Sequence, residues 1–136
     1  TGNRAPRELV EKILPCRNIT YAGYVNDVDV YYQCADLFLN PVENNTGVKT
    51  KLVEAIANNC TTISTTSGAS GIKKEVCGDK LITVADGDWN TFVQKIAESL
   101  KKEQENTPDS FYDHYSWEAI TKKAAGKINE LIFRHE

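Results

Sequence analysis

"ADLFLNPVENNTGVKTKLVEAIANNCTTISTTSGASGI", residues 35–72, is the stretch that decides the fold. It opens with a short apolar run at 35–41 that stops at Asn-Pro, as suits a strand buried on both faces. Residues 47–58 follow with Leu52, Val53, Ile56 and Ala57 at helical spacing, and "TTISTT" at 61–66 is the next strand candidate. The stretch therefore predicts strand, helix and strand in succession.

The same alternation continues on both sides of this stretch. Upstream we expect a helix at 7–14, a strand at 18–23 and one or two helical turns at 27–34. Downstream we expect a loop at 67–72, a short helix through Val76, a strand at 80–85 and a helix at 88–100 with Asp88 as N-cap. A polar linker at 101–110 and a last helix at 117–132, capped by Ser116, complete the chain. Strands alternating with helices predict an α/β fold with a doubly wound, mostly parallel sheet. Ligands of such folds bind beyond the carboxyl ends of the strands, so the loops after Gly23, Leu39 and Ser64 matter most.

The length of 136 residues fits one domain with one sizeable core. The hydrophobic content of 40% and charged content of 26% are those of a soluble globular domain. The net charge of −3 argues against a nucleic-acid surface built on phosphate contacts. No apolar run reaches the ~18 residues that span a bilayer, and the first residues lack a signal-peptide core. A start at Thr-Gly without Met indicates an excised fragment.

The four cysteines form no CxxC pair, and both His lie near the C-terminus, so we predict no metal site. Cys34 and Cys60 lie within apolar stretches, where Cys acts as a small buried hydrophobe. We therefore expect a reducing, cytoplasmic compartment, although the even cysteine count leaves disulfides open.

The start of the 47–58 helix is the first candidate site. Backbone N–H groups at Gly47, Val48 and Lys49 would point at the sheet edge, and the helix dipole adds positive potential there. Glu54 is i+4 from Thr50 and so lies on the same side of the helix. Its carboxylate could accept both hydroxyls of a ribose whose phosphates sit at the helix start.

The alternative is an ordinary helix start, in which Thr46 caps the helix and Glu54 is a surface charge. Local sequence alone favours this alternative, because the segment lacks both the full P-loop pattern and GxGxxG.

Two further segments are weaker candidates. Gly68 and Gly71 could bring the backbone of the 67–72 loop close to a ligand, although a flexible connection explains them equally well. Tyr24 and Val25 follow a predicted strand end and could contact a planar base, but packing is the stronger explanation.

Catalytic groups are not evident in the sequence. It contains no paired carboxylates at a defined spacing, no convincing Ser, His and Asp set, and no GxSxG. His114 stands among aromatic residues and is interpreted as structural. The chain is therefore predicted to bind more than it catalyses, with no catalytic residue of its own.

The ordered motifs "NITYAGYVNDVDVYYQCADLFLNPV", "GVKTKLVEAIANNCTTISTTSGASGI" and "LITVADGDWNTFVQKI" resemble the C-terminal domain of the group 1 retaining glycosyltransferases. The family hallmark, Glu-Ala-hydrophobic-Ala, is matched at residues 54–57. The resemblance covers nearly the whole chain, from about Asn18 to "YSWEAI".

This resemblance implies a Rossmann-like domain, residues 1–136, that is one half of a two-domain transferase of the hexosyltransferase type. Residues 103–136 would be the polar linker and final helix. The donor would be a nucleotide-diphosphate sugar, bound without a metal or other cofactor. The implied contacts are Glu54 with the ribose, residues 47–49 with the diphosphate and sugar, Tyr24 and Val25 with the base, and residues 68–71 as a wall of the pocket.

The chain departs from the family at Thr46, where many members have a Glu that contacts the donor sugar, and Glu43 stands three residues off that register. The "GVKTK" variant looks like a family subgroup that also lacks this Glu. The first strand of the domain and the N-terminal acceptor domain are expected to be missing, so the fragment alone would be inactive.

Alternatives remain: a nucleotide-sugar 2-epimerase half, a non-catalytic nucleotide- or sugar-binding module, or an α/β interaction domain. The acceptor would be a sugar, lipid or polysaccharide reached through the other domain. Localisation would be cytoplasmic or peripheral at the inner membrane face.

Overall fold

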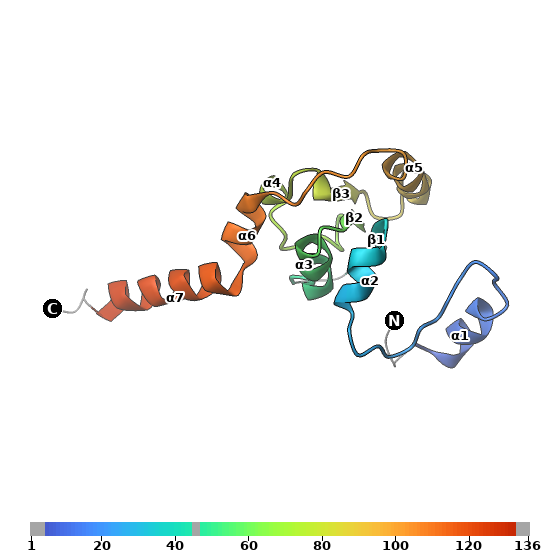
Figure 1. Cartoon of the computed structure of the whole chain (residues 1–136), viewed down its shortest axis with the longest axis horizontal. Helices are drawn as coiled ribbons and strands as arrows, with labels where there is room; N and C mark the ends of the chain where they lie inside the picture. The colour runs from blue at the N-terminus through green and yellow to red at the C-terminus, as the bar shows by residue number, and fades with distance from the viewer. Residues whose placement is uncertain (1–4, 45–46, 133–136) are drawn as a thin grey trace.

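The computed structural model describes residues 5–44 and 47–132. In chain order the elements are α1 (Arg7–Ile13), α2 (Asp29–Cys34), β1 (Leu37–Asn40), α3 (Thr50–Ala57), β2 (Thr61–Thr65), α4 (Lys74–Cys77), the 3₁₀ turn η1 (Gly78–Lys80), β3 (Leu81–Val84), α5 (Trp89–Ser99), α6 (Asp109–Tyr115) and α7 (Trp117–Ile132). Figure 1 shows the sheet at the centre, with α1 and α7 at opposite ends of the molecule.

The three described strands form one parallel sheet in the order β1-β2-β3. Leu37 pairs with Thr61 at one end of the first ladder, and Asn40 pairs with Ser64 at the other. Because all strands run the same way, the loops that follow them leave from a single edge. We call it the carboxyl edge of the sheet.

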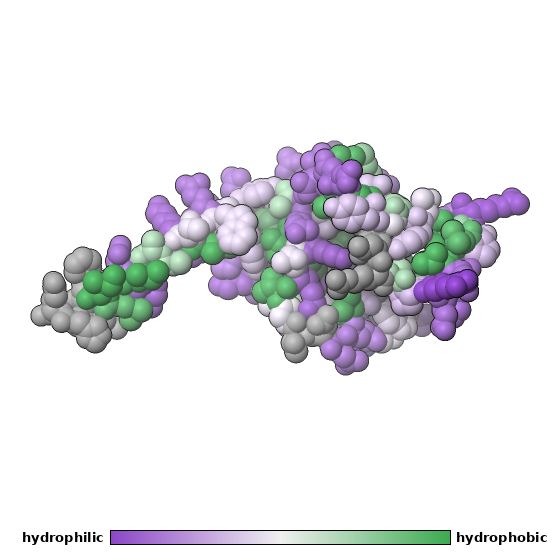
Figure 2. Space-filling model, turned by 90° about the horizontal axis from the view of Figure 1, so that it is seen from below, coloured by the Kyte–Doolittle hydropathy of each residue, from purple (hydrophilic) through white to green (hydrophobic). Residues whose placement is uncertain are grey.

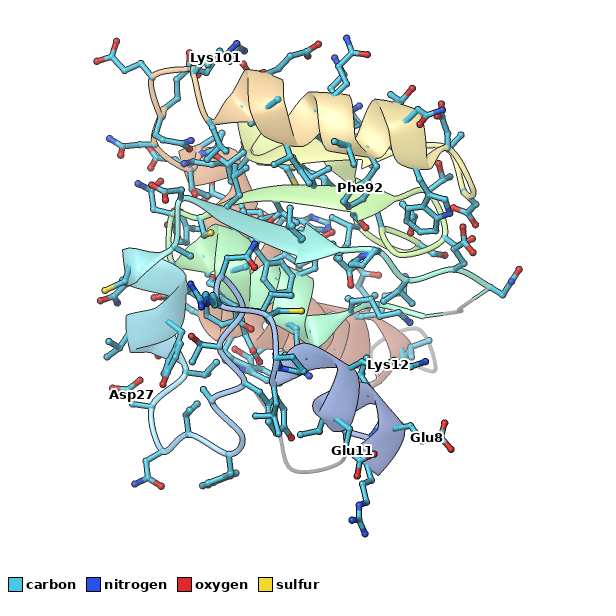
Figure 3. The ribbon with its side chains drawn as sticks, turned by 90° about the vertical axis from the view of Figure 1, so that its right-hand side faces the viewer. Glu8, Glu11, Lys12, Asp27, Phe92 and Lys101 are labelled. Atoms are coloured by element: carbon cyan, nitrogen blue, oxygen red, sulfur yellow. The ribbon has the colours of Figure 1, made fainter. Side chains whose placement is uncertain are left out.

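Helices cover both faces of this sheet. Leu52 and Ile56 of α3 pack in one cluster with Phe38 of β1, whereas Phe92 of α5 packs in a second cluster with Ile63 of β2. In Figure 3, α5 lies above the sheet with Phe92 between them, and α3 lies below. The doubly wound, parallel arrangement expected from the alternation of elements is confirmed.

The expected strand at 18–23 was wrong. The backbone N–H of Ile19 donates to Cys16 O at 3.1 Å, which closes a turn, and the Ile19 side chain is 48% exposed. An isolated extended segment gains little without a neighbour for its backbone groups. The described part of the chain offers the segment no strand to pair with, so it runs as irregular backbone.

The segment after α5 was predicted to be a polar linker, and it is more tightly held than that. The Thr107 hydroxyl donates to Ile56 O at 2.7 Å, and the Thr107 amide donates to Asn59 Oδ1 at 2.8 Å. The helix α6 then follows, which the sequence did not predict, with Phe111 only 1% exposed in the α3 cluster. Residues 101–108 are a loop, but the loop is anchored to α3.

The last helix, α7, begins as predicted, because Ser116 Oγ accepts from the amide of Ala119 at 3.2 Å. None of its 16 residues is buried. Figure 2 shows apolar residues gathered on its outer part, which Ile128, Leu131 and Ile132 supply at 56%, 55% and 59% exposure. Over the described ranges, no helix combines the length and apolarity that crossing a membrane requires.

Candidate functional site

The loops that follow β1, β2 and β3 are joined to one another at the carboxyl edge. Asn40 Nδ2, at the end of β1, donates to Gly68 O in the loop after β2 at 3.1 Å. In the same β2 loop, the backbone N–H of Ser67 donates to Asp86 Oδ1 at 2.9 Å. Asp86 lies after β3, so this edge is a single hydrogen-bonded unit.

Two of the predicted site segments meet at this edge. The space beside Gly71 is closed by Val48: a Cβ added at Gly71 would lie 2.9 Å from Val48 Cγ2 and 3.4 Å from Val48 N. Gly71 also has φ +80°, a conformation that L side chains rarely adopt. Only glycine fits here without strain, and the close approach places the 68–71 loop directly against the segment that leads into α3.

The helix of the candidate site starts later than predicted, at Thr50 rather than Gly47. Gly47 has φ +82°, which is incompatible with a right-handed helix, and Lys49 is extended as the N-cap. Lys49 Nζ donates to Gly47 O at 3.2 Å. The amides that α3 itself cannot use are therefore those of the turn that begins at Thr50. Gly47 and Val48 belong to the loop before it.

Glu54 lies in the second turn of α3, with an exposed side chain. Its Oε2 accepts a hydrogen bond from the Tyr32 hydroxyl of α2 at 3.4 Å. Burial of the phenol, followed by the charge and hydrogen bond of Glu54, raises the pKa of Tyr32 to about 12. Tyr32 thus remains a hydrogen-bond donor to the Glu54 carboxylate at neutral pH.

Tyr24 and Val25 are not brought to the carboxyl edge. They precede α2, whose first residue Asp29 accepts from Asn58 Nδ2 at 3.1 Å at the C-terminal end of α3. Gly47 and Lys49 lie at the other end of that helix. In Figure 3, Asp27 likewise lies on the α2 side, whereas β1 points the opposite way. Tyr24 is 72% exposed.

The predicted contact residues thus fall into three groups. Gly47, Val48, Lys49, Thr50, Gly68 and Gly71 gather at the carboxyl edge. Glu54 lies one turn along α3, while Tyr24 and Val25 lie with the start of α2. Thr46 lies outside the described residues.

Sequence reasoning missed the third loop of this edge. Glu43 Oε1 accepts from the Gly87 amide at 2.6 Å, which ties the β1 loop to the β3 loop. Hydrogen bonds from the side chain and backbone of Ser67 lower the pKa of Asp86. The signal was present in the sequence, since the Asp86-Gly87 turn directly follows a predicted strand.

Outside the carboxyl edge, the described residues form neither a metal cluster nor a disulfide. In residues 5–44 and 47–132 no cluster of three or more His, Cys, Asp or Glu side chains could hold an ion. All four cysteines are free thiols. Cys60 is buried as expected, whereas Cys34 is exposed at the end of α2, so its predicted burial was wrong. The His114 ring packs edge-on against Tyr115 at 4.7 Å, in α6.

A family model described as "Glycosyl transferases group 1" matches residues 1–102 of the chain. The match includes all three strands, α3 and every residue of the carboxyl-edge loops described above. Neither the curated proteins nor the solved structures gave a match to this chain.

Proposed function

The chain belongs to the group 1 glycosyltransferases, and on that basis we propose that this domain binds the nucleotide-sugar donor of a retaining transferase of the hexosyltransferase type. The observation that carries the proposal is the meeting of Gly71 and Val48 beside the start of α3. That approach forms a surface of backbone groups and small residues next to a helix N-terminus.

A nucleoside diphosphate suits this surface chemically. It leaves as an anion when the glycosidic bond of the donor breaks, so charge develops on the phosphate oxygens. The amides of the first turn of α3, the dipole of that helix and the Lys49 ammonium all favour negative charge there. The donor diphosphate would lie at the start of α3, with the ribose hydroxyls on Glu54 one turn further along.

The remaining parts of the reaction are proposed to lie elsewhere. The domain contributes donor binding and stabilisation of the leaving group, without a metal or cofactor. The acceptor, whether sugar, lipid or polysaccharide, would be bound by a second domain. This domain alone is therefore expected to bind donor without turning it over.

A second candidate function is a non-catalytic nucleotide- or sugar-binding module. The observation that favours it is the hydrogen bond from the Gly87 amide to Glu43. Glu43 is the acidic residue nearest to position 46, and its carboxylate already holds two loops together. A donor-sugar contact from that carboxylate would have to share it with the Gly87 amide.

Nucleotide binding is tested by titrating the chain with UDP, GDP and ADP and following its thermal unfolding. A ligand at 100-fold its dissociation constant stabilises the native state by about 2.7 kcal/mol. We expect one of the three nucleotides to raise the melting temperature. Absence of any shift with all three would rule out the donor-binding role.

Glu54→Ala is expected to weaken the binding of that nucleotide by about 1–3 kcal/mol, because a charged partner of the ribose hydroxyls is lost. Isothermal titration calorimetry of parent and variant measures the difference. Glu98→Ala is the matched control, since Glu98 is an exposed carboxylate of α5 on the opposite face of the sheet. Equal affinity in Glu54→Ala and parent would contradict the ribose role.

A further inference from the structure

The central strand has a composition that burial alone does not explain. All five residues of β2 are buried, yet four of them, in the sequence TTIST, carry hydroxyl groups. A buried hydroxyl without a partner destabilises the fold, so each needs a hydrogen bond. Every buried side-chain nitrogen or oxygen of the described residues has such a partner.

The partners of Thr65, the last residue of β2, are loop backbone groups. Its hydroxyl donates to Val42 O, in the loop after β1, and accepts from the Gly68 amide at 3.1 Å. Thr65 is 1% exposed, so neither bond competes with bulk water. One hydroxyl therefore joins the loops that follow two different strands.

Asn40, the last residue of β1, completes the same contact from the other side. Its Nδ2 donates to Gly68 O at 3.1 Å and to Ser64 Oγ at 3.0 Å. Both backbone polar groups of Gly68, its N–H and its C=O, are thus held by side chains from the ends of β2 and β1.

Gly68 lies flush against these side chains. A Cβ at this position would lie 2.7 Å from Asn40 Nδ2, Ser64 Oγ and Thr65 Oγ1 alike. The backbone of the loop at Gly68 therefore packs so closely against the ends of β1 and β2 that no side chain fits there. Three residues later the same loop reaches Gly71, whose neighbour is Val48.

We propose that Thr65 and Asn40 are positioning residues: they seat Gly68, and through it they set the distance between Gly71 and Val48 at the start of the α3 site. They act through the loop rather than by touching a ligand. The consequence for donor affinity rests on the proposed function, whereas the seating of the loop does not.

The test compares three substitutions in β2 of the 136-residue chain. Thr65→Val keeps the shape of the side chain but removes the hydroxyl, and Thr65→Ser restores the hydroxyl. Thr62→Val is the matched control, because Thr62 is equally buried and its hydroxyl bonds to Cys60 O near the other end of the strand. Amide resonances of the ¹⁵N-labelled proteins report the loop, and calorimetry with UDP, GDP and ADP reports the site.

In Thr65→Val we expect the amide resonances of Gly71 and Val48 to shift, although neither residue touches the substituted side chain through a hydrogen bond. Thr62→Val should leave both resonances in place, and Thr65→Ser should return them toward the parent. For the nucleotide that the parent binds most tightly, Thr65→Val should weaken affinity roughly tenfold, equivalent to the loss of one hydrogen bond between the site and the nucleotide.

Each outcome decides a separate point. Parent-like Gly71 and Val48 resonances in Thr65→Val would overturn the positioning role. Shifted resonances with unchanged affinity would show that the seating does not matter to the site, and would overturn the inference there. If the parent binds none of the nucleotides, the proposed function fails, while the resonances still decide the seating.

Asn40→Ala gives a second route should Thr65→Val not fold. It removes the hydrogen bonds from Asn40 Nδ2 to Gly68 O and to Ser64 Oγ while leaving the sequence of β2 unaltered. Gln33→Ala is its control, because the Gln33 amide bonds to Asn58 at the far end of α3. The same two resonances should shift in the Asn40 variant and stay in the Gln33 variant.

Discussion

Tyr32 connects the candidate site to the core through a single side chain. Its ring packs edge-on against Phe38 of β1, with centroids 5.5 Å apart, and its hydroxyl reaches Glu54. The pKa of Tyr32 is raised first because burial disfavours the charged phenolate, and then because ionisation would place a second negative charge beside the Glu54 carboxylate. The contact between Tyr32 and Glu54 therefore favours the protonated phenol.

The stability of the fold should therefore decline at high pH because of this residue. The folded state holds the Tyr32 proton to a pKa of about 12, above the ordinary value of 10.0 in the unfolded chain. The contribution is fully present below pH 10 and is lost as the pH rises towards 12. Tyr32→Phe should remove this part of the decline. The free energy of unfolding in urea, measured at about pH 8 and about pH 11, tests this, because the two pH values lie on either side of the ordinary tyrosine pKa.

Tyr31→Phe serves as the comparison, since Tyr31 is 47% exposed in the same helix. Both variants retain every lysine, so the difference between their slopes isolates Tyr32. Identical slopes in the two variants would refute the raised pKa of Tyr32.

At the scale of single residues, the sequence predicted the position of Glu54 on its helix but not the hydrogen bond that Tyr32 donates to it. The i+4 spacing from Thr50 placed Glu54 on a helix face, which local periodicity determines. Tyr32 is 22 residues away in the chain, and its approach depends on how α2 packs against α3. Contacts of that kind follow from tertiary packing, which spacing along one helix does not encode.

Among the elements, those with strong periodicity were predicted well and those that depend on a neighbour were not. The stripe of α3 predicted its existence, and Asp88 caps α5 as expected by accepting from Thr91 N at 3.0 Å. The start of α3 was predicted at Gly47 but lies at Thr50, because Gly47 has a positive φ. Glycine adopts positive and negative φ about equally readily, so the residue type alone did not show this. The 18–23 segment has strand-like composition but no partner, and composition does not supply one.

The loop that joins α5 to α6 should contribute measurably to stability. Thr107 is only 7% exposed, and Thr107→Val removes one of the two donors to Ile56 O, which keeps the Asn59 amide at 3.0 Å. We expect a loss of about 0.5–1.5 kcal/mol, the range for one intramolecular hydrogen bond. Chemical unfolding of the variant measures this loss.

Thr121→Val is the corresponding control, because its hydroxyl bonds to the backbone of its own helix in an exposed position. That change should stay within about 0.5 kcal/mol. A Thr107 variant as stable as this control would restore the interpretation of the segment as a free linker.

For the molecule as a whole, burial is concentrated around the sheet. Leu52, Ile56 and Ile63 are 0% exposed, whereas the apolar residues of α7 remain open to solvent. The alternation of strands and helices predicted this layered core. The sequence predicted α7 as a helix, and the described chain buries none of its residues.

Substitutions of buried residues around the sheet should destabilise the fold, whereas substitutions on α7 should not. Ile56→Ala is expected to destabilise the fold by about 2–5 kcal/mol, since it opens a cavity beneath the sheet. Ile128→Lys should change the unfolding free energy by less than about 0.5 kcal/mol, because the side chain is already 56% exposed. Urea unfolding of the two variants measures both values, and a large loss in Ile128→Lys would mean that α7 is packed in solution.

The projecting α7 also affects how the molecule turns in solution. Its 16 residues extend about 24 Å, a length comparable to that of a small domain. A body with such an arm has a long axis, as Figure 1 shows, so its rotational diffusion is anisotropic. Amide vectors along α7 and amide vectors across the sheet would therefore relax at different rates. Nuclear spin relaxation of the ¹⁵N-labelled chain would measure this anisotropy without any ligand.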